Sequence, residues 1–211
     1  MVVLGKVHVD NVLYSKLTPE IRDAVRRVKV GVAGLGGLGS NVAEMLMRSG
    51  VSNITIADFD TVEMGNIYKQ NYYLEQIGMA KVDATEENLN KINSFAVVEK
   101  HNVRLDPTNI PHVFRECTIV CECLDAATEK AMFINTMMEK RRGVNVISGS
   151  GMAGIGRSNE IKTERVFDYL YMCGDGIDMA DNEDGLMSPR INICAAHMAN
   201  LVLSLIMKKE P

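Results

Sequence analysis

This 211-residue chain lacks the cysteine patterns of two kinds of cross-link. The five cysteines are an odd number, and no two Cys-x-x-Cys pairs are present. The odd number favours reduced thiols over a disulfide framework, and the missing pairs argue against a structural zinc site. Cys121 and Cys123 lie two positions apart in an apolar run, where a strand would place both on one face as small apolar side chains. We therefore expect no structural zinc.

An excess of basic charge and a long uninterrupted apolar run are also missing. With 23 Lys and Arg against 27 Asp and Glu, the net charge of −4 offers no attraction to nucleic acid or to an anionic membrane. The N-terminal stretch breaks its apolar residues with Lys6 and Asp10, unlike a secretory signal. The apolar stretch 191–207 contains His197 and is shorter than the ~20 residues of a bilayer span. We expect a cytoplasmic protein that contacts neither nucleic acid nor membrane.

Strand and helix patterns alternate along the chain. Short apolar runs rich in β-branched residues predict strands at 28–33, 53–58, 95–103, 117–124 and 144–150. Helices are predicted between them at 40–49, 81–93, 111–115 and 127–142. Such alternation requires right-handed crossovers and a parallel sheet covered on both faces. The sequence therefore predicts an α/β, Rossmann-like, doubly wound fold with a mainly parallel sheet and helices on both faces.

The length predicts a single domain over residues 1–211. Within it, residues 1–27 form an N-terminal helical segment, because Thr18 and Pro19 have the spacing of a helix start. After Gly149 the regular pattern ends. The acidic, turn-rich residues 168–189 are expected to form a mobile crossover-type loop, and residues 190–208 a buried closing helix.

A glycine-rich loop follows the first predicted strand and opens the first predicted helix. Gly34, Gly36 and Gly39 give the pattern G-x-G-x-x-G, and Gly37 adds a fourth glycine. Glycines permit a tight turn and close approach to phosphate, and the helix start supplies unpaired N–H groups. Asp58 ends the second predicted strand, where its carboxylate can accept hydrogen bonds from ribose hydroxyls. The pattern predicts a nucleotide site and leaves NAD, FAD and ATP open.

Three further motifs narrow the choice of nucleotide. GLGGLG is followed by DFDTVEMGNIYKQ (58–70), by IGMAK (77–81) and by CLDAATEK (123–130). In this order they closely resemble the motifs of the E1-like ThiF/MoeB/HesA family, and the resemblance covers about residues 28–207. The tail GLMSPRINICAAHMANLVLSLI is similar to the short, zinc-free ThiF-like group of that family.

The resemblance implies an E1-like adenylation domain that uses ATP and Mg²⁺ to adenylate a carrier protein. The substrate would be the C-terminal glycine carboxylate of a ThiS-like, ubiquitin-fold sulfur carrier that ends in Gly-Gly, in thiamine biosynthesis. The glycine tail would pass beneath SGSGMAGIG (148–156), with Met152 and Arg157 along its path. A homodimer and a sulfur-donor enzyme are the other implied partners.

Family positions give five residues a role in this reaction. A carboxylate must attack the α-phosphate of ATP, and two unit charges 4 Å apart repel by ~4 kcal/mol at an effective dielectric of 20. Lys69 and Lys81 would neutralise the phosphates, Asn66 and Gln70 would hydrogen-bond them, and Asp125 would hold Mg²⁺ through ATP. Asp125 has an alternative role as the cap of a helix that starts at residue 126.

Other positions are ambiguous or depart from the family pattern. Asp60 could bind ribose beside Asp58 or only stabilise a turn. Lys69 stands where the family usually has arginine, whose planar fork a lysine cannot reproduce. The arginine-containing N-terminal segment that often reaches a partner subunit's nucleotide has no clear equivalent. Its possible substitutes are Arg22, Arg26 and Arg27.

Cys173 lies in the expected mobile loop, at a place where related proteins sometimes carry a cysteine that accepts sulfur or bonds to the carrier. An exposed thiol suits that role. The nearby Asp168, Asp175 and Asp178 should raise its pKa and so reduce its thiolate fraction. Cys173 is therefore a candidate catalytic residue whose acidic surroundings oppose reactivity.

Two other functions stay open at this stage. An NAD-linked Rossmann oxidoreductase would explain the glycine loop and Asp58, but not NIYKQ and IGMAK. A nucleotide-binding E1-like module without catalysis would explain Lys69 and the missing arginine segment. The sequence does not distinguish a thiamine carrier from a molybdopterin-type carrier or another small substrate.

Overall fold

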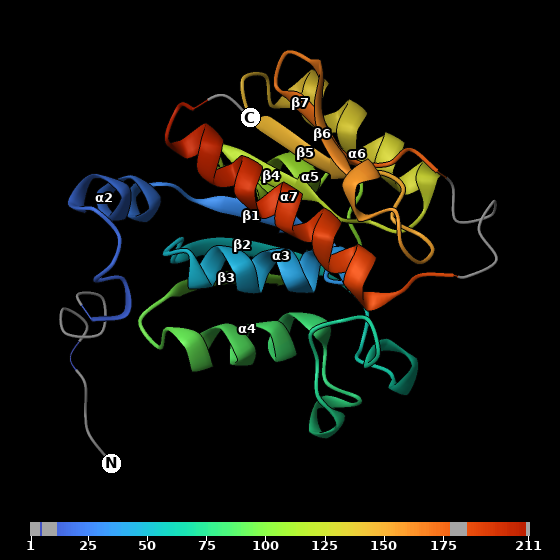
Figure 1. Ribbon diagram of the computed structural model, residues 1–211, viewed down its shortest axis with the longest axis horizontal. Coiled ribbons are helices and arrows are strands. Elements are labelled where there is room, and N and C mark those ends of the chain that lie inside the picture. The colour runs from blue at the N-terminus through green and yellow to red at the C-terminus, as the bar shows by residue number, and fades with distance from the viewer. Residues whose placement is uncertain (1–4, 6–11, 178–184, 210–211) are drawn as a thin grey trace.

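The computed structural model describes residues 5, 12–177 and 185–209, which contain a seven-stranded sheet (Figure 1). The strand order is β3-β2-β1-β4-β5-β7-β6. All neighbouring strands pair in parallel except β6, which runs antiparallel to β7. The strands are β1 Val30–Ala33, β2 Asn53–Asp58, β3 Val97–Asn102, β4 Ile119–Glu122, β5 Asn145–Gly149, β6 Lys162–Phe167 and β7 Leu170–Gly174. The predicted Rossmann-like α/β fold is confirmed.

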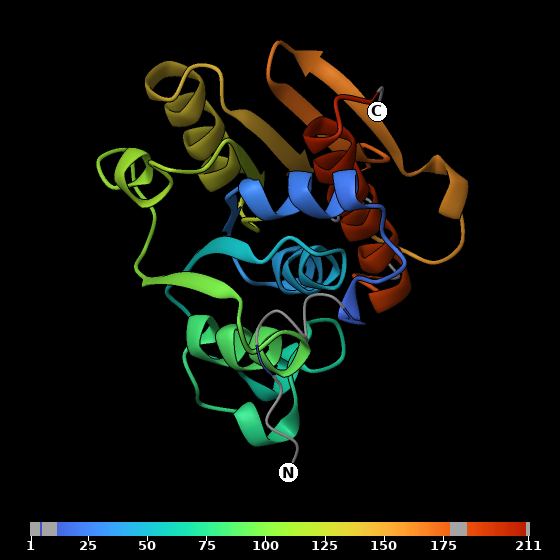
Figure 2. The ribbon, with the colours of Figure 1, turned by 90° about the vertical axis from the view of Figure 1, so that its left-hand side faces the viewer.

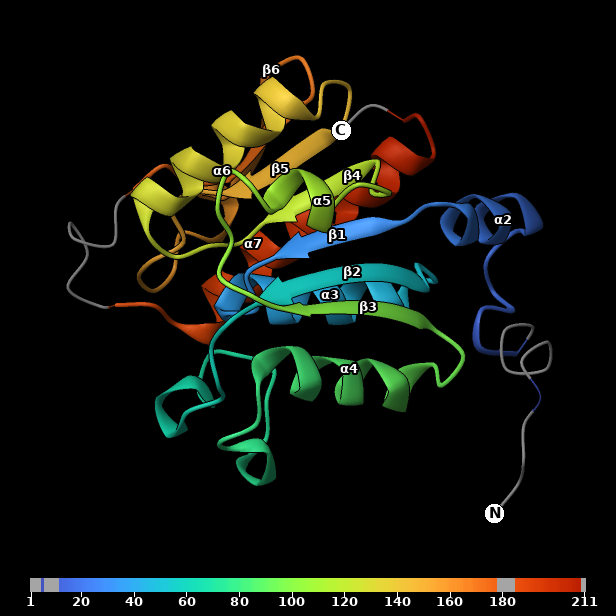
Figure 3. The ribbon, with the colours of Figure 1, turned by 180° about the vertical axis from the view of Figure 1, so that it is seen from behind.

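Helices cover both faces of the sheet. Figure 2 shows α3 and α7 on one side of the strands and α5 and α6 on the other, and Figure 3 brings α5 and α6 to the front. Each side has its own apolar cluster, one containing Leu46 and Met198, the other Phe114 and Phe133. The helices are α2 Pro19–Arg27, α3 Gly37–Arg48, α4 Lys81–Ile92, α5 Ile110–Val113, α6 Ala127–Lys140 and α7 Ser188–Ile206, with single 3₁₀ turns η1 Met64–Asn66, η2 Leu74–Gln76 and η3 Ser158–Glu160.

The central strand β1 is apolar throughout because both of its faces are buried. Gly31 lies under the ring of Phe114, and a Cβ atom at this position would be 2.6 Å from Phe114 Cδ1. A larger residue here would push α5 away from the sheet. This tight packing fixes β1, and with it the loop that leaves its carboxyl end.

The prediction for the region after Gly149 is wrong in part. Residues 162–174 form the hairpin β6–β7, so the expected mobile loop 168–189 contains the strand Leu170–Gly174. The hairpin turn places Tyr169 at φ 65° instead of a glycine, and five of the six residues of the edge strand β6 are exposed. Both features remove the sequence signals of a hairpin. Residues 178–184 of the expected loop lie outside the described residues.

The closing helix is confirmed, with bounds at Ser188–Ile206 in place of 190–208. It has 19 residues and contains an 18-residue window with a mean hydropathy of 1.2, so by length and composition it could cross a membrane. In this fold its apolar face instead packs into the core through Ile191, Cys194 and Val202, against α3 and the sheet.

The helix α2 lies at the far end of α3 from the glycine loop. Tyr14, which precedes α2, donates a hydrogen bond to the carbonyl oxygen of Met47 at 2.8 Å, in the last turn of α3. The arginines of α2 are therefore distant from the glycine loop of their own chain (Figure 1). A contact between a nucleotide and Arg22, Arg26 or Arg27 stays a prediction that requires a partner subunit.

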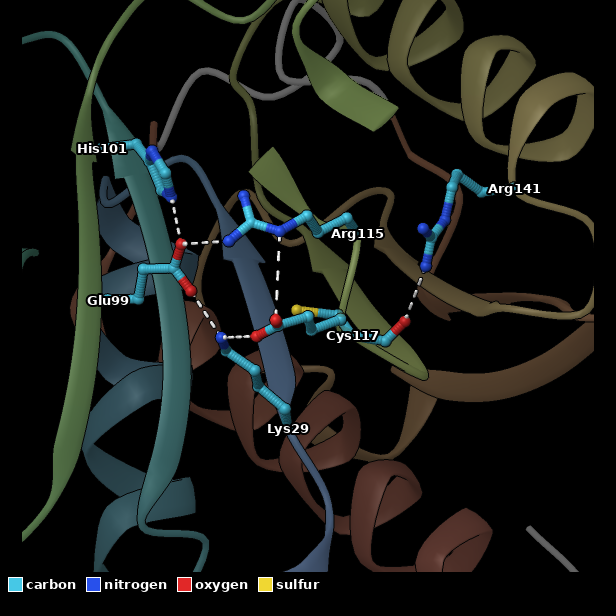
Figure 4. Close-up of polar contacts among 7 residues, drawn as sticks. Lys29, Glu99, His101, Arg115, Cys117 and Arg141 are labelled. Carbon is cyan, nitrogen blue, oxygen red and sulfur yellow. Dashed lines mark hydrogen bonds and ion pairs between the residues drawn. The ribbon is translucent and has the colours of Figure 1, made fainter. Parts of the chain in front are cut away.

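A network of ion pairs ties β1, β3 and β4 together at the amino end of the sheet (Figure 4). The ammonium group of Lys29 contacts the carboxylates of Glu99 and, at 2.6 Å, Glu116. His101 Nε2 lies 3.1 Å from Glu99, and Arg115 lies within 4.0 Å of Glu99 and 3.9 Å of Glu116. The Lys29 ammonium holds the pKa of Glu99 below its ordinary value, by its hydrogen bond and its charge.

Replacing Lys29 with methionine is expected to destabilise the fold by about 1 kcal/mol at pH 7, because two carboxylates lose their shared cation. Both folded-state carboxyl pKa values lie below the ordinary 4.5, so this stabilisation is present above pH 4.5 and is lost as the pH falls through the folded-state values. Urea unfolding at pH 7 and at lower pH measures the effect. A difference from wild type that does not shrink in acid would contradict it. The matched control Lys91→Met removes an exposed lysine that pairs with Glu87.

Candidate functional site

The glycine loop between β1 and α3 requires glycine at two positions. Gly34 has φ 86°, and its N–H donates to the carbonyl oxygen of Ala57 at 2.8 Å. A Cβ atom at Gly34 would lie 2.7 Å from the carbonyl oxygen of Cys123, and one at Gly39 would lie 1.8 Å from the carbonyl oxygen of Gly34. Both positions bring main chain against main chain, so no side chain fits.

Two buried side chains hold the glycine loop at Leu35. The N–H of Leu35 donates to Asp58 Oδ2 at 2.6 Å, and the Tyr72 hydroxyl donates to the Leu35 carbonyl at 2.8 Å. Burial raises the pKa of Tyr72, which keeps its phenol protonated as a donor. Asp58 Oδ1 also accepts from the N–H of Asp60 at 2.8 Å. Asp58 therefore stabilises the loop, and its contact with ribose stays a prediction.

The N-terminus of α3 faces an open space. Its N-cap residue is Gly36, so no side chain caps the first N–H groups. Both carboxylate oxygens of Asp125 lie 3.6 Å from the point where a Cβ atom of Gly36 would be, and Gln70 Nε2 lies 3.9 Å from it. The uncapped amides and the helix dipole suit an anion in this space.

A cavity of about 470 Å³ extends from this helix end. The ammonium group of Lys69 forms no ion pair with a described residue and lies 5.4 Å from the ring centroid of Tyr68. Gln70 is buried, and its Oε1 has no partner among the described residues. Both side chains are thus available to a ligand. The lining residues are Gly37, Leu38, Lys69, Gln70, Leu124, Asp125, Ala127, Lys130, Gly149, Ser150, Gly151, Met152, Ala153, Gly176, Ile177, Leu186 and Ile191.

A second cavity of about 130 Å³ lies beside the first, and Leu124 and Asp125 line both. Its lining includes Asp58 and Lys81, with the ring of Phe59 stacked 4.9 Å from the guanidinium carbon of Arg104. Lys69 and Lys81, predicted to act together on phosphates, therefore line two adjoining cavities. Asp125 stands at their junction.

The buried side chain of Lys81 already has a partner. Its ammonium group lies 3.0 Å from Asp60 Oδ2. The structure therefore gives Asp60 an ion-pairing role in addition to its position in the second cavity. Its predicted contact with ribose is untested.

Two further site predictions can be compared with the structure. Asn66 lines neither cavity, and its Oδ1 accepts from the N–H of Glu63 at 2.9 Å at the start of η1, so its phosphate contact stays a prediction. The alternative that Asp125 caps the next helix is wrong. The N-cap of α6 is Ala126, with no side-chain hydrogen bond, and Asp125 stays exposed at the cavity.

The sequence interpretation missed a polar network under the cavity. Glu122, at the end of β4, is fully buried and accepts hydrogen bonds from Leu124 N–H, the Ser148 hydroxyl and Lys130. Lys130, in the first turn of α6, lines the larger cavity. The sequence feature that could have indicated this network is Glu122 itself, the one charged residue in the apolar run CTIVCECL.

Of the two residues expected along the path of a glycine tail, one lies on the cavity wall, and the path itself stays a prediction. Met152 lines the larger cavity, whereas Arg157 is exposed outside it. The carbonyl of Arg157 instead accepts from Arg190 at 2.8 Å, and Arg190 also contacts Asp175 in a buried ion pair. This pair ties the start of α7 to the segment that follows β7.

The prediction that Cys173 is an exposed loop thiol is wrong. It lies in β7 with 0% exposure, and burial raises its pKa to about 11. The expected acidic cluster is not the cause, because Asp168 pairs with Arg165 and Asp175 with Arg190. Asp178 lies outside the described residues. A buried thiol that is protonated at neutral pH cannot serve as a nucleophile in this conformation.

We therefore expect Cys173→Ala to keep nucleotide binding and any adenylation rate within about twofold of wild type, with a stability loss of about 1 kcal/mol from the lost buried contacts. Native protein should also resist alkylation by iodoacetamide at Cys173, as mapped by peptide mass spectrometry. Rapid alkylation, or loss of adenylation in a folded Cys173→Ala variant, would restore a catalytic role.

Comparison with known proteins places this site in a family context. Residues 9–211 match the ThiF family. The chain is 27% identical over 190 residues to the adenylyltransferase and sulfurtransferase UBA4 of Candida glabrata, covering 87% of this chain and 43% of that protein. It is 30% identical over 189 residues to ubiquitin-like modifier-activating enzyme 5 of Xenopus laevis, covering 83% and 46%. The chain thus spans less than half the length of these relatives.

Solved structures with the same fold include nucleotide complexes. The tRNA N6-threonylcarbamoyladenosine dehydratase TcdA of Escherichia coli with AMP superposes with a TM-score of 0.85 at 17% identity, covering 99% of this chain and 98% of that one. The same enzyme has been solved with ATP. E. coli MccB with AMPCPP and MccA gives a TM-score of 0.70 at 22% identity, covering 94% and 64%. At these identities the similarity demonstrates the fold.

Proposed function

Because this chain belongs to the ThiF family of E1-like adenylyltransferases, we propose that it activates the C-terminal glycine carboxylate of a ThiS-like, ubiquitin-fold sulfur carrier with ATP. One observation carries the proposal: two adjoining cavities meet at Asp125, beside the uncapped N-terminus of α3. A nucleotide and a carboxylate substrate can therefore meet at one point. Relatives that carry the names adenylyltransferase and ubiquitin-like modifier-activating enzyme support this class of reaction.

The proposed step joins a carboxylate oxygen of the carrier to the α-phosphorus of ATP. The bond from that phosphorus to pyrophosphate breaks, and an acyl-adenylate remains. No general base is needed, because the attacking carboxylate is ionised at pH 7. The ammonium of Lys69, which has no ion pair with a described residue, the Nε2 donor of Gln70 and the amides of α3 offset the repulsion between the anions. Positioning and charge compensation then supply the catalysis.

The residues present fit a magnesium ion that accompanies ATP. Asp125 is exposed at the cavity junction, and its carboxylate has no hydrogen bond or ion pair with a described residue. Mg²⁺ in nucleotide sites is commonly held by one or two carboxylates together with the substrate's phosphates. Asp125 would hold the ion, and the bound ion would supply positive charge beside the phosphates.

The identity of the carrier is part of the proposal. The UBA4 name combines adenylyltransferase with sulfurtransferase, and MccB was solved with MccA, which together favour a small protein or peptide substrate and a sulfur-donor partner. The glycines at 149 and 151 in the cavity wall favour a narrow Gly-Gly terminus. We further propose a role in thiamine biosynthesis, a cytoplasmic location and a homodimer, in which α2 arginines would reach the partner's nucleotide.

Exchange of labelled pyrophosphate into ATP tests this function. With Mg²⁺ and a ThiS-like carrier we expect exchange, and none with a carrier that lacks its terminal glycine. ATP binding without exchange would indicate a nucleotide-binding module without catalysis. Binding of NAD without ATP would favour the oxidoreductase.

A further inference from the structure

The buried carboxylate of Glu122 has every acceptor position occupied. Its Oε1 accepts from the N–H of Leu124 at 2.7 Å, its Oε2 accepts from the Ser148 hydroxyl, and Lys130 Nζ lies 3.3 and 3.1 Å from the two oxygens. Glu122 and Ser148 are register partners on β4 and β5, and Lys130 reaches them from α6. Glu122 is 0% exposed, so it cannot contact a ligand itself.

This network breaks two local preferences at one wall of the larger cavity. A buried carboxylate is costly unless it is fully paired. Lys130 lies near the start of α6, where a positive charge is unfavourable beside the helix dipole, and Glu129 in the first turn compensates for it only in part. Such local conflicts occur mainly at functional sites. Lys130 lines the cavity, and Glu122 lies beneath it. The cavity is therefore in contact with the Lys130 side chain, whose ammonium group is held in place by Glu122.

The charge balance indicates what Lys130 can bind. An ammonium group has three N–H donors, and among the described residues its only acceptor is the Glu122 carboxylate. Its charge is already balanced, so a second anion placed here would also be repelled by Glu122. A neutral acceptor such as a peptide carbonyl avoids that repulsion. Phosphate has better positions at Lys69 and the α3 N-terminus, across the same cavity.

The adjacent wall suits an extended main chain without side chains. Gly149 and Gly151 line the cavity, and a Cβ atom at Gly149 would lie 2.4 Å from Leu38 Cδ1. Leu38 therefore packs directly against the main chain of β5, and no side chain fits on Gly149 at this point of the wall. A glycine tail that lies along this wall has no side chains, so it offers mainly main-chain carbonyls as hydrogen-bond acceptors.

We infer that Lys130 donates a hydrogen bond to a main-chain carbonyl of the substrate's C-terminal glycine tail, and that Glu122 and Ser148 position its ammonium group. This inference rests on the proposed function, because it assigns a specificity contact for the same carboxylate substrate. The inference gives the two lysines of the larger cavity different ligands. Lys69 would bind phosphate, and Lys130 would bind the peptide.

Isothermal titration of the full chain tests the inference without turnover. The chain is loaded with α,β-methylene-ATP and titrated with a ThiS-like carrier. The single variant Lys130→Met would leave Glu122 unpaired and destabilise the fold, so the informative variant is Lys130→Met with Glu122→Gln. Loss of one charge-assisted hydrogen bond should weaken carrier binding by about tenfold to a hundredfold. Binding of the nucleotide analogue should change less than about twofold.

Four outcomes of these measurements are distinguishable. Carrier affinity near that of wild type in the double variant would overturn the inference, because Lys130 would then only neutralise Glu122. Selective loss of carrier affinity, regained with Lys130→Arg and absent in the exposed control Lys91→Met, would support it. If the wild type binds the carrier but shows no pyrophosphate exchange, the proposed function fails. The ratio of carrier affinities between the double variant and wild type then still decides this inference. If the wild type does not bind the carrier, both the proposed function and this inference are overturned.

Discussion

Replacing Asp125 with asparagine is expected to lower carrier-dependent pyrophosphate exchange by ~10²–10³-fold while ATP still binds. Asparagine keeps the size and shape of the side chain at the junction of the two cavities and removes its charge. The proposed contact with Mg²⁺ is therefore lost, and the phosphate charge is less well offset. Nucleotide affinity should change less, because the α3 amides, Lys69 and Gln70 remain.

Exchange rates and nucleotide dissociation constants, each titrated with Mg²⁺, separate these effects. The matched control is Asp168→Asn, which changes an aspartate that is 84% exposed in the β6–β7 turn. Rates of exchange equal to wild type in Asp125→Asn would remove this residue from the reaction. A raised requirement for Mg²⁺ in the variant would support the proposed ion contact.

Replacing Gly39 with alanine should disrupt the site at its base. The added Cβ atom would lie 1.8 Å from the carbonyl oxygen of Gly34, which belongs to the main chain and cannot rotate away. Either α3 or the glycine loop must shift, and we expect a loss of about 3 kcal/mol or more in the free energy of unfolding. The hydrogen bonds that hold Leu35 should be lost in the same shift, and ATP binding with them.

Urea unfolding and nucleotide titration measure both losses. Gly65 offers a matched control, because no heavy atom lies within 4 Å of a Cβ atom built there. Gly65→Ala should change stability by less than about 0.5 kcal/mol and leave ATP binding intact. Near-normal ATP binding by Gly39→Ala would contradict the prediction, because it would show that the glycine loop accommodates the added Cβ atom without losing its nucleotide site.

The first half of the fold could be predicted from the sequence because local signals and burial agree there. The strand at 53–58 has the predicted bounds, and the glycines at 34 and 39 occupy the positions that need them. Asp125 and Lys69 were assigned from the family resemblance instead, and both line the larger cavity. Here each local pattern and the global packing indicate the same structure.

The later region could not be predicted because its determinants are not local. β6 is a polar edge strand, and its hairpin turn uses Tyr169 at a positive φ where a glycine would have been a signal. Cys173 was judged from acidic neighbours in sequence, whereas its burial depends on α7, whose Cys194 donates to the Cys173 carbonyl. The pairing of Glu122 with Lys130 likewise requires the sheet register and the helix direction together.

The central claim, adenylation of a carrier's terminal carboxylate, is tested most directly by intact-mass spectrometry of the carrier. A ThiS-like carrier is incubated with the chain, ATP and Mg²⁺, beside the same carrier without its terminal glycine. Our account predicts that the intact carrier gains the mass of one AMP at its C-terminus and that the shortened carrier does not. An intact carrier that stays unmodified while the chain binds ATP would contradict it.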